Sequence, residues 1–462
     1  MFGINKTLKI HFIGIGGIGM SGIAEILINL GYQVSGSDVS ESGNVLKLKD
    51  IGAQIYIGHQ SENINDVQLI VYSSAIDERN PEIIRAKELS LPIIKRAEML
   101  AELMRLKFGV AVAGSHGKTT TTSFLSTILK ELDYKPTCII GGIVKNLGGH
   151  AVKGDGDYLI AEADESDGSF LFLNPIMSVI TNIDNDHLDY YKNEENIELA
   201  FEQFANKVPF YGCVAINIHD KKSMHLRSKL RRPNVTYGIQ TDGLEIDFFA
   251  KNIEFTEEGT TFWVSNNSEE YQATISLSGK HNVLNATAAI AMACKIGVSL
   301  KNACDKISMF EGVGRRFEIL YKTDKMIVVD DYGHHPTELK ATIETAHNRY
   351  PKRKTIAIFE PHRFTRTKEF WNEFRDSFKD VDKVYLAPIY PASEVEIPGI
   401  NSERLANEIN QKYSNTQLIT NWNELENIFS TYQNEDIVIL SMGAGSISKM
   451  TRAKLESWKQ KQ

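Results

Sequence analysis

The sequence has few cysteines and no long apolar run. Its four cysteines among 462 residues are Cys138, Cys213, Cys294 and Cys304. They lie too far apart to form a metal-binding or redox motif, a pattern typical of a reducing cytoplasm. No apolar run approaches the roughly 18 residues that a membrane helix needs. We therefore expect a cytoplasmic protein with no membrane insertion.

The sequence also lacks an excess of positive charge. Its 51 Lys and Arg residues face 59 Asp and Glu residues, which gives a net charge of -8. Such a chain has no broad basic surface for a nucleic-acid backbone, so we expect no nucleic-acid partner. The content of 42% hydrophobic and 24% charged residues is typical of a globular protein. A chain of this length predicts about three domains.

Short β-rich runs alternate with helical runs along the whole chain. The pattern begins at "LKIHFIGIG", restarts at "FGVAVAGSHGKT" and restarts again at "KMIVVDDYG". Alternation of this kind is typical of parallel α/β sheets, and residues 246 to 278 alternate like an antiparallel hairpin. We predict three α/β domains, namely a Rossmann-like domain at 1–105, a central P-loop ATPase-type domain with an antiparallel extension at 106–313, and a C-terminal Rossmann-like domain at 314–462.

A first glycine loop lies near the N-terminus. Gly14, Gly16 and Gly19 form a G-x-G-x-x-G turn between a predicted strand and a predicted helix. Backbone amides at such a helix N-terminus can hold a pyrophosphate. Asp38 ends the next strand, about where a ribose-binding carboxylate would lie. Any nucleotide diphosphate fits this pattern, and a purely structural turn is the alternative.

A second glycine loop follows about a hundred residues later. Residues 114 to 119, "GSHGKT", also join a strand to a helix. Lys118 can reach terminal phosphates, and the Thr119 hydroxyl is placed to bind Mg²⁺. The loop departs from full Walker spacing because the earlier glycine would fall at Val112. Two loops of different type indicate two nucleotides, a diphosphate at the first loop and a triphosphate at the second.

Nine short elements carry a more specific signal. In chain order they are "GIGGIGMSGIAEIL", "SGSD", "GSHGKTTTT", "EADESDGSF", "TNIDNDHLD", "GKHNVLNATAA", "GVGRRFE", "DDYGHHPTE" and "PHRFTRT". With these elements the chain resembles the Mur ligase family of peptidoglycan synthesis over essentially its whole length. The resemblance implies that the first loop holds the UDP of a sugar substrate and that the second loop holds ATP.

The resemblance also implies a reaction. The expected enzyme is an ATP-dependent ligase that joins L-alanine to the lactyl carboxylate of UDP-N-acetylmuramate through an acyl phosphate and releases ADP and phosphate. Its expected partners are UDP-N-acetylmuramate, L-alanine and ATP, and we expect a monomer or a weak homodimer. A sister enzyme that attaches a ready-made tripeptide to the same sugar shares part of the pattern and is the alternative within the family.

Individual positions receive roles from the same resemblance. The residues expected to act in catalysis are Lys118, His334 and Arg316. The expected UDP-sugar ligands are Gly14, Gly16, Gly17, Gly19, Asp38, Ser73 and Ser74. The expected ATP ligands are Gly114, Ser115, His116, Gly117, Lys118, Thr119, Thr120, His281, Asn282, Asn285, Arg316 and Asp331. The expected amino-acid ligands are Tyr332, His334, Arg363 and Arg366.

The expected cofactor is Mg²⁺, for which Mn²⁺ can substitute. Mg²⁺ needs hard oxygen donors, and Glu162 ends the strand "YLIAEAD". By resemblance, the expected metal ligands are Thr119, Glu162 and His187. Three rival ligands stay open, namely Asp164, Glu165 and Asp167.

Paired arginines and one histidine characterise the C-terminal third. By resemblance Arg316 closes over the ATP phosphates, although Arg315 is equally plausible on local grounds. Arg363 and Arg366 supply two guanidinium groups suited to the carboxylate of an incoming amino acid, with solvated surface arginines as the alternative. A general-base role for His334 stays open, because phosphate or solvent could take the proton. We assign no carbamylated lysine.

Two other classes of protein compete with a ligase. An NAD-dependent oxidoreductase would use the first glycine loop and Asp38 but would leave the second loop without a role. A P-loop regulatory protein that hydrolyses ATP to switch conformation would leave the arginines of the third domain unused. Both alternatives also leave the ordered set of nine elements unexplained.

Overall fold

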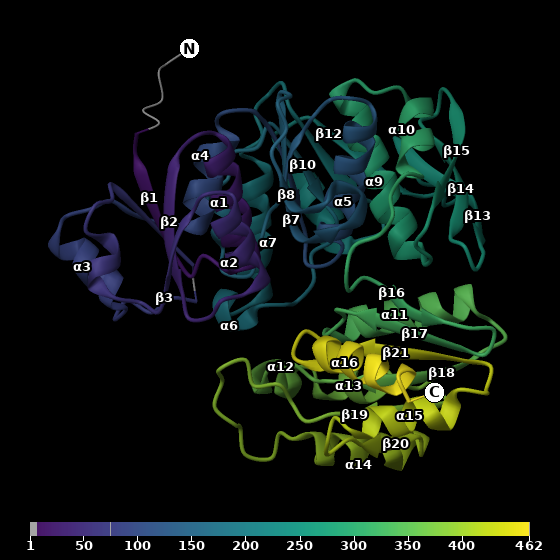
Figure 1. Ribbon diagram of the computed structural model, residues 1–462. Helices are drawn as coiled ribbons and strands as arrows, with labels where there is room; N and C mark the ends of the chain where they lie inside the picture. The colour runs from purple at the N-terminus through teal and green to yellow at the C-terminus, as the bar shows by residue number, and fades with distance from the viewer. Residues whose placement is uncertain (1–6, 74, 462) are drawn as a thin grey trace. The chain divides into compact units, whose positions relative to one another are not determined.

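The computed structural model describes residues 7–73 and 75–461 (Figure 1). The chain forms two compact units. Unit 1 comprises Met1–Asn252, Trp263–Ala273 and Leu284–Glu311, and unit 2 comprises Ile253–Phe262, Thr274–Val283 and Gly312–Gln462. The domain limits near residues 105 and 313 stay predictions.

The N-terminal part of unit 1 is a five-stranded parallel sheet with the order β3-β2-β1-β4-β5. Its strands are β1 (Lys9–Ile13), β2 (Gln33–Asp38), β3 (Gln54–Ile57), β4 (Leu69–Tyr72) and β5 (Ile93–Lys95). Its helices are α1 (Ile18–Asn29), α2 (Gly43–Asp50), η1 (Ser61–Ile64), α3 (Pro81–Glu88) and α4 (Arg96–Met104). The strand order reverses between β1 and β4, so the loops after these two strands flank the crevice in which doubly wound folds bind ligands.

The central sheet has ten strands with the order β15-β14-β13-β12-β11-β10-β6-β9-β7-β8. The strands are β6 (Phe108–Ala113), β7 (Thr137–Val144), β8 (Gly149–Val152), β9 (Tyr158–Glu162), β10 (Met177–Ile180), β11 (Cys213–Asn217), β12 (Asn234–Ile239), β13 (Phe248–Phe255), β14 (Thr260–Ser265) and β15 (Glu270–Ile275). The sheet is mixed, because β8 runs antiparallel to β7 while β6 runs parallel to both of its neighbours, β9 and β10.

The helices of this region begin with α5 (Lys118–Glu131), which follows the second glycine loop. The others are η2 (Lys145–Leu147), η3 (Ser169–Phe172), α6 (Leu188–Tyr191), α7 (Glu194–Ala205), α8 (Lys221–Lys229), α9 (Lys280–Ile296) and α10 (Leu300–Ile307).

Helix α1 joins the N-terminal sheet to the central sheet within one hydrophobic core. A β-carbon at Gly22 would lie 2.9 Å from the β-carbon of Ala151, so glycine permits this close approach. Beside it, Ser21 Oγ and His150 Nε2 form a buried hydrogen bond of 3.1 Å. Burial lowers the pKa of His150, which favours the neutral ring. The two glycine loops therefore belong to one packed unit.

The C-terminal sheet in unit 2 has six strands with the order β16-β17-β21-β18-β19-β20. The strands are β16 (Glu318–Lys322), β17 (Met326–Asp331), β18 (Lys354–Phe359), β19 (Lys383–Leu386), β20 (Thr416–Leu418) and β21 (Ile437–Met442). Its helices are α11 (Pro336–Arg349), α12 (Phe364–Glu369), α13 (Trp371–Asp376), α14 (Ser402–Tyr413), α15 (Glu424–Tyr432) and α16 (Ile447–Lys459). Only β16, at the edge, runs antiparallel to its neighbour in this sheet.

Strand β21 shows why the centre of this sheet is buried on both faces. Val438 and Leu440 pack into one hydrophobic cluster, while Ile437 and Ile439 pack into another. An uninterrupted apolar run of this kind is typical of a central parallel strand covered by helices on both sides.

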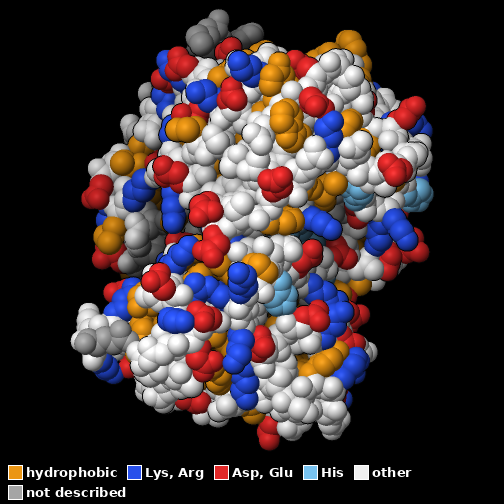
Figure 2. Space-filling view, turned by 90° about the vertical axis from the view of Figure 1, so that its right-hand side faces the viewer, with side chains coloured by type: hydrophobic (Ala, Val, Ile, Leu, Met, Phe, Trp, Pro, Cys, Tyr) orange, Lys and Arg blue, Asp and Glu red, His pale blue; other side chains and the backbone are white. Residues whose placement is uncertain are grey.

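Charge is mixed on the face drawn in Figure 2, where Lys and Arg side chains are interspersed with Asp and Glu. Within residues 7–73 and 75–461, no helix has both the length and the apolar content needed to cross a membrane.

Candidate active site

The first glycine loop is held by the end of β2. Gly14 has a φ of +80°, which favours glycine. The Ser37 carbonyl accepts hydrogen bonds from the amides of Gly14 at 2.8 Å and Ile15 at 3.0 Å. Asp38 Oδ2 accepts from the Gly16 amide at 2.9 Å. The Asp38 side chain therefore orders the loop by binding a backbone amide of the loop.

The loop leads into an uncapped helix N-terminus. Gly17 precedes α1, no side chain caps the helix, and its first turn contains no acidic residue. The first amides of a helix have no partner within it, so this end can bind an anion. Gly14 also adjoins Ser73, since a β-carbon at position 14 would lie 3.8 Å from that of Ser73. Ser74 lies outside the described residues.

The second glycine loop requires glycine at two positions. Gly114 and Gly117 have φ values of +138° and +84°. A β-carbon at Gly114 would overlap the Thr181 hydroxyl, and one at Gly117 would lie 2.5 Å from Asn285 Oδ1. Asn285, a predicted ATP ligand on α9, thus lies beside this loop.

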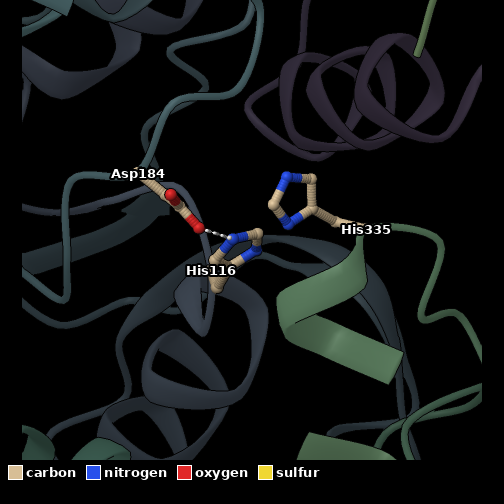
Figure 3. A group of neighbouring side chains, drawn as sticks. All are labelled: His116, Asp184 and His335. Carbon is tan, nitrogen blue, oxygen red and sulfur yellow. Dashed lines mark hydrogen bonds and ion pairs between the residues drawn. The ribbon is translucent and has the colours of Figure 1, made fainter. Parts of the chain in front are cut away.

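Residues that follow β10 hold this loop from the other side. Asn182 Oδ1 accepts from the His116 amide at 2.9 Å, and Ser115 Oγ accepts from the Asp184 amide at 2.8 Å. The His116 ring also hydrogen-bonds to Asp184, with 3.1 Å between Nε2 and Oδ2 (Figure 3). The His116 side chain therefore anchors the loop. Thr120 lies in the first turn of α5, where it is buried.

Lys118 lies inside the loop and pairs with a buried carboxylate. Its ammonium donates to the Gly114 carbonyl at 2.6 Å and lies 2.7 Å from Glu165 Oε2. Glu165 is 2% exposed. Burial raises the pKa of Glu165 to about 7, although Lys118 opposes the shift. For Lys118, the lowering effect of burial is outweighed by Glu165, Glu162 and Asp164, which raise its pKa overall. The sequence analysis considered Glu165 only as a rival metal ligand, so it did not predict the ion pair between Glu165 and Lys118.

Thr119 and Glu162 meet at the carboxyl edge of neighbouring parallel strands. Val112 of β6 is in register with Glu162 of β9. The Thr119 hydroxyl donates to Glu162 Oε2 at 2.9 Å, and the Gly141 amide donates to the same oxygen at 2.8 Å. A hydroxyl and a carboxylate are the hard oxygen donors that Mg²⁺ prefers. The donor set therefore fits that ion.

His187 also lies near Glu165. It precedes α6 with a φ of +62°, and its Nε2 lies 3.9 Å from Glu165 Oε1 and 3.5 Å from Asp186 Oδ2. In the described part of the chain, Glu162 and His187 share no group of three His, Cys, Asp or Glu ligand atoms within 4.8 Å of one another. That these two side chains serve as metal ligands therefore stays a prediction.

The remaining rival ligands form local turns. Asp164 Oδ1 accepts from the Ser166 amide at 3.1 Å, and Asp167 Oδ1 accepts from the Ser169 amide at 3.0 Å. Each carboxylate thus already has a backbone partner two residues further along the chain.

Helix α9 carries three of the predicted ATP ligands, namely His281, Asn282 and Asn285. The Asn282 side-chain amide donates to the Ser278 carbonyl at 2.8 Å, which is a local contact at the helix start. Burial, followed by the charge of Arg316, lowers the pKa of His281 to about 4. His281 is therefore a neutral ring at neutral pH.

In unit 2, the arginine pair stacks on Tyr332. The Arg315 and Arg316 guanidinium carbons lie 4.6 Å and 5.2 Å from the ring centroid. Arg315 Nη2 also donates to the Gly443 carbonyl at 2.6 Å, whereas Arg316 Nη1 lies 3.9 Å from Glu338 Oε1. Arg315 is thus fixed to its own domain more firmly than Arg316.

The Asp331 carboxylate holds the backbone of the loop that carries Arg315 and Arg316. It accepts from the amides of Phe317 and Gly333, each at 2.8 Å, and from the Thr342 hydroxyl at 3.0 Å. Burial raises the pKa of Asp331. These contacts engage both carboxylate oxygens in shaping the arginine loop.

The predicted amino-acid ligands form a cluster around His362, which the sequence interpretation missed. The His362 ring centroid lies 5.8 Å from that of His334, and Arg366 Nη1 lies 3.5 Å from His362 Nδ1. His334 Nδ1 lies 3.0 Å from the Tyr332 carbonyl. Arg366 is only 8% exposed. Burial, followed by His334 and Arg366, lowers the pKa of His362 to about 3, so its ring is neutral.

Arg363 stands at the entrance of α12 in an uncommon conformation. Its φ is +72°, and its amide donates to the Tyr390 carbonyl at 2.8 Å. Strained backbone that its surroundings hold in place is concentrated at functional sites. The same element, "PHRFTRT", also contains His362. Its place in this element is the one sequence signal that could have identified His362 as part of the site.

Three protein-family models match successive parts of the chain. The model described as Mur ligase family, catalytic domain, matches residues 9–108. The Mur ligase middle domain matches residues 112–293, and the Mur ligase, glutamate ligase domain matches residues 315–445.

Relatives match the chain over nearly its whole length. The UDP-N-acetylmuramate--L-alanine ligase of Trichlorobacter lovleyi is 45% identical over 442 residues, which are 95% of this chain and 96% of the relative. The enzyme of the same name from Aquifex aeolicus is 46% identical over 448 residues, which are 96% of each chain.

A solved structure supports the same relationship. The crystal structure of UDP-N-acetylmuramate-alanine ligase MurC from Thermotoga maritima aligns with a TM-score of 0.83 at 29% identity and covers 98% of this chain and 100% of that chain. This match confirms the predicted three-domain α/β architecture. The chain belongs to the Mur ligase family.

Proposed function

We propose that this chain is an ATP-dependent ligase that joins L-alanine to the lactyl carboxylate of UDP-N-acetylmuramate in peptidoglycan precursor synthesis. One observation carries the proposal, namely two glycine loops of different type, each opening a helix, within a single packed unit. The names of the relatives from Trichlorobacter lovleyi and Aquifex aeolicus support the substrates.

The reaction needs activation because a carboxylate oxygen is a poor leaving group. Transfer of the ATP γ-phosphoryl group to the lactyl carboxylate gives an acyl phosphate and ADP. The amine of L-alanine then attacks the carbonyl carbon, and its nitrogen gives up a proton to phosphate, solvent or His334. The C–O bond to phosphate breaks, and inorganic phosphate leaves with that bond's electron pair. The protein mainly positions the groups and offsets negative charge.

The second loop is the proposed ATP site. The amides of residues 114 to 120 bind the phosphates, and the Lys118 ammonium, 2.6 Å from the Gly114 carbonyl, adds positive charge. His281, Asn282 and Asn285 contact the adenine, and Arg316 closes on the phosphates from the loop that Asp331 shapes. The weaker attachment of Arg316 favours it over Arg315 for this role.

Thr119, Glu162 and His187 would hold the proposed Mg²⁺, for which Mn²⁺ can substitute. When bound, the ion would neutralise charge on the transferring phosphoryl group. The hydrogen bond between Thr119 and Glu162 keeps both oxygens at the mouth of the loop.

The first loop is the proposed UDP-sugar site. Gly16, Gly17 and Gly19 bring the backbone of the α1 N-terminus close to the pyrophosphate, while Gly14 provides the turn. Asp38 orders the loop, and Ser73 lies across the crevice from it. Ser74 belongs to this proposal on the family resemblance alone.

The amino-acid site is proposed around Tyr332, His334, Arg363 and Arg366. A guanidinium fork pairs with a carboxylate in two parallel bonds, so the two arginines suit the carboxylate of free alanine. His334 contacts the incoming amino acid. We also propose that the chain is cytoplasmic, which its scattered, unpaired cysteine pattern favours, and that it is a monomer or a weak homodimer.

A second candidate is a ligase that adds a peptide to the same sugar nucleotide. A murein peptide ligase from Psychrobacter arcticus aligns with a TM-score of 0.72 at 24% identity and covers 98% of each chain, which shows a shared fold. The same fold could therefore serve either acceptor.

One assay separates these functions. Phosphate release is measured with ATP, Mg²⁺ and UDP-N-acetylmuramate, and with alanine, serine, glycine or the tripeptide as acceptor, omitting each component in turn. We expect release that requires every component and is fastest with alanine. Preference for the tripeptide would favour the second candidate, and release without UDP-N-acetylmuramate would favour a P-loop regulatory ATPase. Calorimetry with NAD tests the oxidoreductase alternative, for which tight NAD binding without a response to UDP-N-acetylmuramate is required.

A further inference from the structure

Arg96 stands at the junction of the two glycine loops. It is the first residue of α4 and follows β5, whose carboxyl end lies at the same edge of the N-terminal sheet as the end of β1. A β-carbon at Gly19 would lie 3.1 Å from both Cδ and Nη1 of Arg96. The guanidinium therefore lies against the first turn of α1, at the uncapped N-terminus of that helix.

On its other side, Arg96 faces the second loop. Its Nη2 lies 3.5 Å from Asp164 Oδ2, with the two side chains 24% and 44% exposed. Asp164 in turn adds to the charge that raises the pKa of Lys118. Arg96 is thus in contact with the UDP-sugar loop and with the acidic segment beside the ATP loop.

The guanidinium is placed for a ligand that the protein itself does not supply. Arginine has five N–H donors. Across residues 7–73 and 75–461, none of the five Arg96 donors forms a hydrogen bond, and the Asp164 ion pair is its one polar contact. A partly exposed ion pair of this length contributes little to stability, so Arg96 can exchange Asp164 for a ligand easily.

We propose that Arg96 binds the pyrophosphate of the UDP-sugar. This inference rests on the proposed function of the first loop. Planar guanidinium donors match phosphate oxygens, and the α1 amides beside Gly19 provide the rest of the anion site. A β-carbon at residue 19 would press on the Arg96 side chain, so glycine leaves the guanidinium room beside the helix N-terminus.

The test is calorimetry on the full-length chain with three probes, namely UDP-N-acetylmuramate, UDP and a non-hydrolysable ATP analogue. The variants are Arg96→Gln and Arg96→Lys. The matched control is Arg105→Gln, which removes an exposed arginine at the other end of α4 that pairs with Glu102. Thermal unfolding of each variant checks that the fold is retained, and Arg96→Lys preserves the charge if Arg96→Gln is unstable.

We expect Arg96→Gln to weaken the binding of UDP and of UDP-N-acetylmuramate by roughly tenfold to a hundredfold, the usual effect of losing a charged hydrogen bond. Arg96→Lys should give a smaller loss because it keeps the charge without the fork. Binding of the ATP analogue, and all binding by Arg105→Gln, should stay within about twofold of wild type.

Three results would overturn the inference while leaving the proposed function intact. One is wild-type affinity of Arg96→Gln for both UDP ligands. Another is weaker binding of UDP-N-acetylmuramate with normal binding of UDP, which would place Arg96 at the lactyl carboxylate. The third is equal weakening of the ATP analogue. Failure of the wild-type protein to bind UDP-N-acetylmuramate would instead overturn the proposed function itself.

Discussion

Replacing Glu165 by glutamine should make the stability of the metal-free protein less dependent on pH. Burial raises the pKa of Glu165 from 4.5 to about 7 in the folded chain. The folded state therefore binds this proton more tightly than the unfolded state, and ionisation of Glu165 opposes folding. The destabilisation is absent well below pH 4.5, grows between pH 4.5 and about 7, and is complete at higher pH.

The magnitude follows from the size of the shift. One pKa unit corresponds to about 1.4 kcal/mol, so a shift of roughly 2.5 units gives about 3 kcal/mol in full and about 2.5 kcal/mol between pH 5 and pH 8. Glutamine cannot ionise, so Glu165→Gln should lose this dependence. In the wild-type chain Lys118 stays charged over the same range, because neighbouring carboxylates raise its pKa.

Urea denaturation in EDTA, followed by circular dichroism at pH 5 and pH 8, measures the effect. The free energy of unfolding of Glu165→Gln, relative to wild type, should rise by about 2.5 kcal/mol from pH 5 to pH 8. Glu102→Gln is the matched control, because Glu102 is an exposed residue paired with Arg105, and it should follow wild type. Equal pH profiles for wild type and Glu165→Gln would refute the argument.

Three further predictions concern activity. Lys118→Ala should abolish phosphate release but keep the circular dichroism spectrum of the folded chain, because Glu165 can take a proton once its partner is lost. Near-normal turnover would contradict the assignment of ATP to this loop. Glu162→Ala and His187→Ala should both be impaired and partly rescued by excess Mg²⁺, and full activity of both at low metal would move the ligands to the rival acidic residues. Arg363→Lys and Arg366→Lys should raise the KM for alanine by roughly tenfold to a hundredfold with little change for ATP. Equal effects on alanine and ATP would place these arginines at the phosphates.

Strand ends explain which contacts the sequence could predict. Thr119 follows one short apolar strand and Glu162 ends another, and parallel strands bring their carboxyl ends to one edge. The structure places β6 and β9 side by side, with the two side chains hydrogen-bonded. The pattern "GSHGKT" also predicted a loop between a strand and a helix, and the structure shows positive φ at Gly114 and Gly117 of that loop.

Acidic residues within one short segment could not be sorted from the sequence. Asp164, Glu165 and Asp167 look alike as rival ligands, yet Asp164 and Asp167 form turns with the backbone while Glu165 points at Lys118. This outcome depends on local turn geometry and on a partner 47 positions away. Periodicity carries no information about either.

Strand order is the second kind of information that the sequence withheld. The first glycine loop follows β1, whereas Arg96 follows β5, far along the chain. Only the spatial order β1-β4-β5 in the sheet brings Arg96 beside Gly19. The contacts of Asp331 were likewise not indicated by the sequence. Its role as an ATP ligand stays a prediction, and the structure shows that its carboxylate accepts hydrogen bonds from three donors of its own domain.

The central claim is that a lactyl carboxylate is activated as an acyl phosphate by ATP before alanine attacks it. UDP-N-acetylmuramate labelled with ¹⁸O in that carboxylate tests the claim directly, with mass spectrometry of the phosphate and the amide product. The account predicts that one labelled oxygen passes to each released phosphate, because the acyl C–O bond breaks when the amine adds. Amide formation with unlabelled phosphate would contradict it.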